Sequence, residues 1–110
     1  MAFDECLAGR VRDILAPQPG LGERKMFGGL CFTLNGNMVC GIVGDTLMLR
    51  LNENLADEAL RKPHVRPMDF TGRPMRNMVY VDTPGLRGRA LRTWVEKAAD
   101  HVRTLPPKAR

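Results

Sequence analysis

The sequence predicts an α+β domain in which helices cover one face of an antiparallel sheet. Two apolar segments joined by Asn35-Gly36 indicate a β-hairpin, because both turn positions tolerate a positive φ. Apolar residues at helical spacing near both ends of the chain indicate amphipathic helices. Of the 110 residues, 44% are hydrophobic and 26% are charged, as in a typical globular domain. We therefore expect one domain over residues 1–105 and a flexible tail over 106–110.

The elements are expected in the order α-βββ-α-ββ-α. The helices are predicted over residues 2–16, 53–61 and 87–104, each ending near a proline or a Pro-Gly cluster. A meander over 24–51 is predicted to hold strands at 25–34, 37–43 and 46–51, and a second hairpin over 67–82 to hold strands at 67–71 and 75–82. Because hairpins dominate this order, the sheet should be antiparallel and the helices should pack on one of its faces.

Two-residue turns at Asn35-Gly36 and Gly44-Asp45 would set the register of the meander. In that register Cys31 faces Cys40, and Cys40 faces Leu49. One sheet face then carries Cys31, Met38, Cys40, Ile42, Leu47, Leu49 and Leu51, and we expect it to lie under the helices. The opposite face carries Leu30, Phe32, Leu34, Val39, Val43, Thr46, Met48 and Arg50. This second face is more apolar than a sheet face in contact with water normally is.

An occupant is therefore expected on the second face. It is either a partner, with a homodimer as one form, or loops and the C-terminal segment of the same chain. The candidate partner surface consists of Arg24, Lys25, Phe32, Val39, Met48 and Arg50. No cofactor or metal is expected, because the sequence has no Cys-x-x-Cys motif and because His64 and His101 have no ligand-spaced neighbours.

The basic residues are concentrated in the C-terminal half of the chain. Residues 1–60 carry five Lys or Arg against eight Asp or Glu, whereas residues 61–110 carry twelve against four. This asymmetry permits an acidic partner or nucleic acid. Direct nucleic-acid binding through the basic half is accordingly the alternative function, although no helix-turn-helix, zinc-finger or base-stacking pattern accompanies it.

Three cysteines, Cys6, Cys31 and Cys40, are too few for a disulfide framework. The predicted register places Cys31 and Cys40 opposite each other, which suggests either a redox-responsive pair or two buried thiols acting as small apolar groups. The sequence contains no serine, so mechanisms with a serine nucleophile are excluded. The N-terminus does not resemble a signal peptide and no apolar run reaches membrane-spanning length, so we expect a cytoplasmic protein.

Two glycine clusters resemble phosphate-binding loops only weakly. Gly20-Leu21-Gly22 is not followed by Gly-Lys-Ser/Thr and lacks a strand-turn-helix context. Gly28-Gly29 falls inside the strand predicted at 25–34, where it indicates a bulge or a close approach of two backbones.

Several motifs together resemble the TfoX N-terminal domain family. They are Arg24-Lys25-Met26-Phe27-Gly28-Gly29, Leu34-Asn35-Gly36-Asn37-Met38 and Asp45-Thr46-Leu47-Met48-Leu49-Arg50, followed by Arg66-Pro67-Met68, Tyr80, Pro84, Leu91 and Trp94. The resemblance covers residues 5–105. It implies an α+β fold with an antiparallel sheet and supplies no catalytic residues. Where relatives often carry an aromatic residue and a lysine in the third strand, this chain has Met48 and Arg50, which keeps the charge and loses the stacking capacity.

The family is named for a bacterial regulator of genetic competence, in which this domain precedes a separate C-terminal domain. The resemblance implies a stand-alone N-terminal-type domain here. Together with the lack of a catalytic set, it leads us to expect a non-enzymatic regulatory or protein-interaction module, with a link to transcription or competence regulation.

Overall fold

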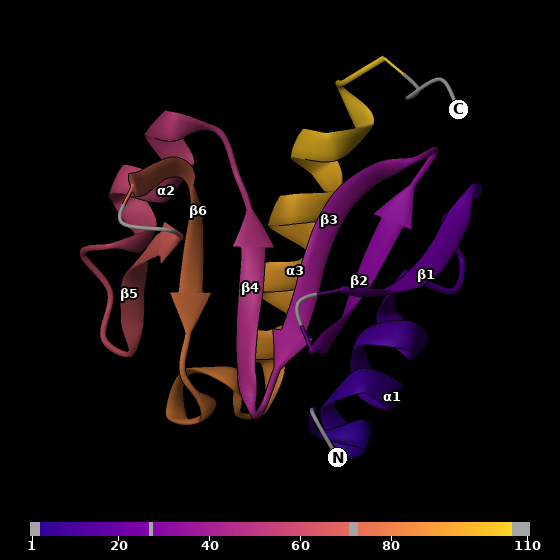
Figure 1. Cartoon of the computed structure of the whole chain (residues 1–110), viewed down its shortest axis with the longest axis horizontal. Coiled ribbons are helices and arrows are strands. Elements are labelled where there is room, and N and C mark those ends of the chain that lie inside the picture. The colour runs from indigo at the N-terminus through magenta and orange to yellow at the C-terminus, as the bar shows by residue number, and fades with distance from the viewer. Residues whose placement is uncertain (1–2, 27, 71–72, 107–110) are drawn as a thin grey trace.

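A computed structural model describes residues 3–26, 28–70 and 73–106 of the chain (Figure 1). The elements are α1 (Glu5–Leu15), β1 (Leu21–Met26), β2 (Gly29–Leu34), β3 (Asn37–Val43), β4 (Thr46–Arg50), α2 (Glu53–Ala59), β5 (Val65–Phe70), β6 (Arg73–Val81), the 3-10 helix η1 (Thr83–Leu86) and α3 (Arg89–Arg103). The strands form one antiparallel sheet in the order β1-β2-β3-β4-β6-β5. The predicted α+β class is confirmed. None of the helices in these ranges is long and apolar enough to span a bilayer.

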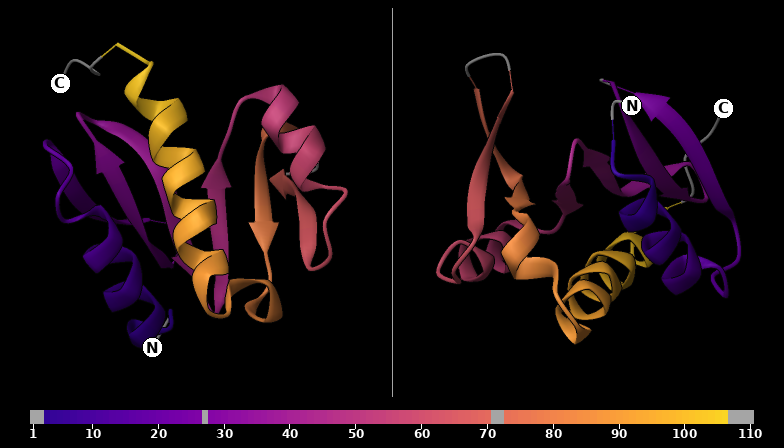
Figure 2. Two further views of the ribbon diagram at one scale, coloured as in Figure 1. Left: turned by 180° about the vertical axis from the view of Figure 1, so that it is seen from behind. Right: turned by 90° about the horizontal axis from the view of Figure 1, so that it is seen from below.

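All three α-helices lie on the same side of the sheet, as the view from below in Figure 2 shows. Helix α3 crosses β2, β3 and β4 and also contacts α1, while α2 packs against β6. The main core fills the space between the helices and the sheet. Its largest fully buried side chains include Phe32, Leu15, Leu34, Ile42, Leu47, Leu49, Leu51 and Leu91. Within the described residues, no helix lies on the opposite face of the sheet.

The two long helices follow their sequence patterns closely. Asp4 begins α1, and its carboxylate accepts hydrogen bonds from the backbone N–H groups of Cys6 and Leu7 at 2.9 and 3.1 Å. Leu7 and Val11, about one turn apart on α1, are buried. In α3 the buried positions form an apolar stripe at helical spacing: Leu91, Trp94, Val95, Ala98, Ala99 and Val102.

The strand predicted at 25–34 is wrong, because two strands occupy this part of the chain. Strands β1 and β2 form a hairpin, and Gly28 lies between them with φ +74°, which glycine adopts without strain. A Cβ atom on Gly29 would collide with the backbone carbonyl oxygen of Ile42 on β3. The prediction of a close backbone approach at Gly28-Gly29 is thus confirmed at Gly29. The sheet therefore has six strands rather than five among the described residues.

The Asn35-Gly36 turn is confirmed, with φ values of 52° and 84°. Beside the turn, Thr33 faces Met38 as predicted. Beyond it the register shifts by one residue, so that Phe32 faces Cys40 and Cys31 faces Gly41. This shift is a β-bulge, in which one extra residue on β3 opposes the partner strand. Every pair predicted between β2 and β3 beyond the bulge, including Cys31 with Cys40, is therefore wrong.

The register of β3 with β4 is confirmed, with Cys40 opposite Leu49 and Ile42 opposite Leu47. The predicted strands at 67–71 and 75–82 correspond to β5 and β6, which begin two residues earlier than expected. Of the predicted tail, only Pro106 lies within the described residues; its carbonyl oxygen accepts a hydrogen bond from the Asn37 side chain at 2.9 Å.

Candidate interaction surface

A second apolar cluster lies on the sheet face that carries no helix. Its buried members all contain sulfur: they are Cys31, Met48, Met68 and Met78. Half-buried Met38, Val43 and Tyr80 pack against them. Thioether side chains are flexible and polarizable, and proteins use them on surfaces that adapt to varied partners. We call these seven residues the sulfur-rich face.

Cross-strand pairing brings the members of the sulfur-rich face together from five strands. Met48 on β4 lies directly opposite Tyr80 on β6 in the antiparallel register. On the other side of β4, Met48 lies opposite Gly41, where the missing side chain leaves room. A Cβ atom on Gly41 would lie only 2.6 Å from Met48 Cε and 3.1 Å from Cys31 Sγ. Glycine at this position therefore allows the two sulfur-containing side chains to converge over the middle of the sheet.

Arginine side chains surround the sulfur-rich face. Arg24 on β1 lies opposite Cys31 on β2, and Arg50 on β4 lies opposite Met78 on β6. Each arginine therefore shares a sheet face with the residue opposite it. Within the described part of the chain, neither of these two has a carboxylate oxygen within 4.0 Å. Arg66 lies opposite Tyr80, with its guanidinium carbon 5.0 Å from the ring centroid. The rim of the surface is thus basic.

Arg66 is held in place by a second contact. Its Nε and Nη2 atoms donate hydrogen bonds to the two carboxylate oxygens of Asp82, both at 2.9 Å. This fork holds the pKa of Asp82 below its usual range and raises that of Arg66, chiefly through the hydrogen bonds. The Asp82 charge therefore neutralises Arg66, and the net positive charge of the rim comes from Arg24 and Arg50.

The residues of the predicted partner surface do not all share one face of the sheet. Arg24, Met48 and Arg50 lie on the sulfur-rich face or its rim. Phe32 and Val39 do not, because the bulge in β3 turns them into the main core, where both are 0% exposed. Lys25 is exposed, but it lies opposite the core residue Leu30 and so projects from the other side of β1.

The predicted redox pair is also corrected. Cys31 belongs to the sulfur-rich face and Cys40 to the main core, so their side chains point to opposite sides of the sheet. All three cysteines are free thiols, and Cys6 alone is exposed. Burial raises the pKa of the Cys40 and Cys31 thiols, although the positive charge of Arg24 partly offsets the effect at Cys31. Raised pKa values and burial both disfavour the reactive thiolate.

Ion pairs neutralise part of the basic charge of the C-terminal half. Four arginines form them: Arg66 with Asp82, Arg76 with Glu53, Arg92 with Glu96, and Arg103 with Asp100. Two of these pairs lie on α3, where acidic residues therefore interrupt the basic ones. The net charge of this half therefore overstates the field that a nucleic-acid backbone would meet.

The two histidines are far apart in the sequence, and neither belongs to the sulfur-rich face. His64 is exposed and has φ +66°, and His101 is half-buried on α3. Burial lowers the pKa of His101, and the positive charge of Arg50 lowers it further. Among residues 3–26, 28–70 and 73–106, no three His, Cys, Asp or Glu side chains are grouped closely enough to hold a metal ion.

Sequence reasoning wrongly placed two members of the surface, Cys31 and Met38, under the helices, and it missed three others: Met68, Met78 and Tyr80. They come from the second hairpin, for which no register was derived. The alternation of Met78 and Tyr80 with the core residues Val79 and Val81 was the available signal, because successive side chains in a strand point to opposite faces.

Comparisons with known proteins bear on the whole domain. No curated protein and no solved structure matches the chain. The family model described as the TfoX N-terminal domain matches residues 13–102, which include the sheet, α2 and nearly all of α3. The match contains every residue of the sulfur-rich face and of its arginine rim. The chain therefore belongs to the TfoX N-terminal domain family.

Proposed function

We propose that this domain is a non-enzymatic regulatory module that binds an acidic segment of a partner protein on its sulfur-rich face. The observation that carries the proposal is the combination of a second apolar cluster with two arginines, Arg24 and Arg50, that have no carboxylate partner in the described chain. Membership of a family named for a competence regulator supports a regulatory role, including a link to transcription or competence.

The apolar centre and the charged rim suit different parts of such a partner. Half-exposed Met38, Val43 and Tyr80 offer adaptable apolar contacts. The guanidinium groups of Arg24 and Arg50 match the geometry of carboxylates and can bind them through two parallel hydrogen bonds. A segment that alternates apolar and acidic residues would use both features at once.

Charge also argues against a second copy of the chain as the occupant. In a two-fold dimer the same patch meets itself, so Arg24 and Arg50 of both copies would enter one interface. Like charges brought together in this way oppose association. The chain as a whole carries a formal net charge of +5, which adds to the repulsion. An acidic partner removes this cost, and we therefore propose it in preference to the homodimer.

The test is a fluorescence-anisotropy titration of the labelled peptide acetyl-Glu-Leu-Asp-Phe-Glu-Leu-Asp-Phe-amide. Wild-type protein should bind it, and Arg24→Gln and Arg50→Gln should each raise Kd about tenfold, because each removes one charge-assisted contact. Arg92→Gln is the matched control, since Arg92 lies on α3 and is paired with Glu96 at 3.4 Å. That variant should bind as the wild type does.

Three outcomes would contradict the proposal. The peptide with lysine in place of every acidic residue could bind as tightly, which would remove the role of charge. Arg92→Gln could weaken binding as much as Arg24→Gln does, which would show that only net charge matters. Preferential, steeply salt-dependent binding of a DNA or RNA oligonucleotide would favour the nucleic-acid alternative instead.

A further inference from the structure

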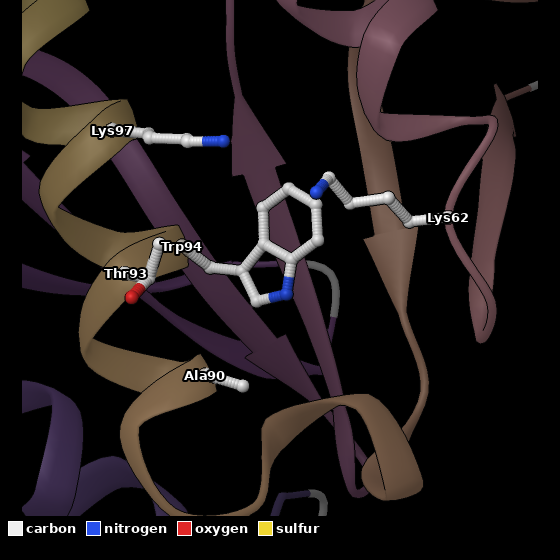
Figure 3. Close-up of a pocket in the computed structure, with 5 residues that line it drawn as sticks. All are labelled: Lys62, Ala90, Thr93, Trp94 and Lys97. Carbon is white, nitrogen blue, oxygen red and sulfur yellow. The ribbon is translucent and has the colours of Figure 1, made fainter.

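A small pocket lies on the helix-covered side of the domain, away from the sulfur-rich face. Its volume is about 210 Å³, and it is lined by Lys62, Ala90, Thr93, Trp94 and Lys97. Four of these residues belong to α3, and Lys62 comes from the segment that follows α2. Figure 3 shows the Lys62 and Lys97 side chains extending toward the indole of Trp94 from opposite sides, with the Ala90 methyl group at the lower end.

The polar atoms directed at this pocket are hydrogen-bond donors. Lys62 and Lys97 each contribute an ammonium group, and neither has a carboxylate oxygen within 4.0 Å among the described residues. None of the hydrogen bonds that the described residues form near this pocket involves the indole N–H of Trp94. The Thr93 hydroxyl already donates to the carbonyl oxygen of Arg89 at 3.1 Å. No acidic side chain lines the pocket, so its electrostatics favour an anion.

The rest of the lining is apolar. The Lys97 ammonium nitrogen lies 5.4 Å from the centroid of the Trp94 ring, an attractive cation–π distance that holds this lysine over the indole. Trp94 is only 7% exposed, so its ring forms a fixed wall rather than a mobile side chain. The ring, the Ala90 methyl group and the two lysine stems together surround space for a short hydrocarbon body.

Size narrows the class of ligand. Pockets for drug-sized ligands start at roughly 300 Å³, so a pocket of about 210 Å³ admits a smaller molecule. We propose that the Lys62–Trp94–Lys97 pocket binds a small apolar carboxylate of about the size of benzoate. The carboxylate accepts hydrogen bonds from the two ammonium groups, and the hydrocarbon part lies against Trp94 and Ala90. This site is independent of the acidic-peptide surface proposed above.

Trp94 is the one tryptophan of the chain, which makes the site directly observable. We would titrate ¹⁵N-labelled protein with benzoate and follow the indole Nε1–H resonance. A ligand of this size supports a Kd on the order of 1 mM. Benzamide, which is neutral and nearly isosteric, tests the need for charge, and inorganic phosphate tests the need for a hydrocarbon body. Benzoate should give a saturable shift that benzamide and phosphate do not.

Two substitutions test the lysines. Lys62→Met and Lys97→Met keep an unbranched side chain and remove the charge, and each should raise Kd for benzoate about tenfold. Lys62 is exposed, so Lys62→Met leaves the fold intact even if Lys97→Met disturbs the packing of Trp94. Lys25→Met is the matched control and should leave Kd unchanged, because Lys25 is exposed on the edge strand β1, which contributes no residue to the pocket.

Each contrary result overturns the proposal. The indole resonance could remain unshifted at about ten times the expected Kd, which would mean that the pocket binds no apolar carboxylate. Benzamide could match benzoate, which would remove the role of the lysines. Phosphate could match benzoate, which would assign the pocket to anions in general. Lys25→Met could weaken binding as much as Lys62→Met, which would reduce the effect to net charge.

Discussion

At the scale of single residues, the cysteines show how one backbone irregularity changes chemistry. Cys31 and Cys40 are both 0% exposed, yet they lie on opposite sides of the sheet. A disulfide requires Cβ atoms about 3.5–4.5 Å apart and directed toward each other, which opposite faces do not allow. The thiols instead contribute as small apolar groups, one in each apolar cluster.

This arrangement predicts the thiol reactivity of the native protein. With an aromatic disulfide reagent, Cys6 should react at once, whereas Cys31 and Cys40 should react only as fast as the fold opens, because burial keeps both as protonated thiols. The absorbance time course of the released thiolate measures this directly. Denatured protein provides the control and should release three equivalents at once. Mild oxidation of the native protein could instead remove the Cys31 and Cys40 thiols rapidly. That result would show that the two can form a disulfide, which would contradict the structure.

At the scale of elements, the bulge in β3 is the feature that sorts side chains between the two faces. The register shifts between Phe32 and Thr33, and Val39 and Cys40 both reach the main core although they are adjacent in the sequence. In a regular strand, neighbours point to opposite faces. The extra residue therefore moves Phe32, Leu30 and Leu34 beneath the helices and turns Cys31 outward.

Val39→Thr tests the bulge, because it changes a methyl group to a hydroxyl at nearly constant volume. At a fully buried position without a partner, the hydroxyl should lower the free energy of unfolding by about 1–3 kcal/mol. Val43→Thr is the matched control on the same strand. Val43 is a half-buried member of the sulfur-rich face, so the loss of unfolding free energy should be much smaller there. Urea denaturation measures both. Equal costs would contradict the placement of Val39 in the core.

Much of the element-level structure was predictable, and for local reasons. Asn35-Gly36 sets its own turn through two positive φ values, and helical spacing in α3 places its buried stripe without reference to the rest of the chain. The hairpin at Gly28 was missed because the segment over 25–34 was interpreted as one continuous strand. Neither the bulge nor that hairpin has a sequence signal as strong as Asn-Gly.

At the scale of the whole molecule, the two proposed binding sites lie on different sides of the sheet. The sulfur-rich face, with Arg24 and Arg50 at its rim, lies on the bare side of the sheet, whereas the Lys62–Trp94–Lys97 pocket lies among the helices. The two proposed sites therefore share no residue, and a substitution in one can be made without altering the contacts of the other.

The charge on the sulfur-rich face predicts the association state of the chain in the absence of a partner. Sedimentation velocity should give a monomer of 12.3 kDa, because a two-fold contact through this face would bring the arginines of both copies together. The double variant Arg24→Gln/Arg50→Gln removes that repulsion. If the variant dimerises through this face, the wild type should still be a monomer under the same conditions. A wild-type dimer that persists when sodium chloride is reduced would contradict this reasoning, since lower salt strengthens the repulsion.

The sequence by itself determined the fold class, the three helices and the turns at Asn35-Gly36 and Gly44-Asp45. These features depend on periodicity and turn chemistry between residues close together in the chain. Only the tertiary structure decided which residues share a face, that β4 pairs with β6, and that Lys62 meets Trp94. The physical reason is that side chains alternate along a strand, so a single extra residue on β3 inverts the faces beyond it. Contacts between distant segments follow from how the sheet and helices assemble, which no local pattern records.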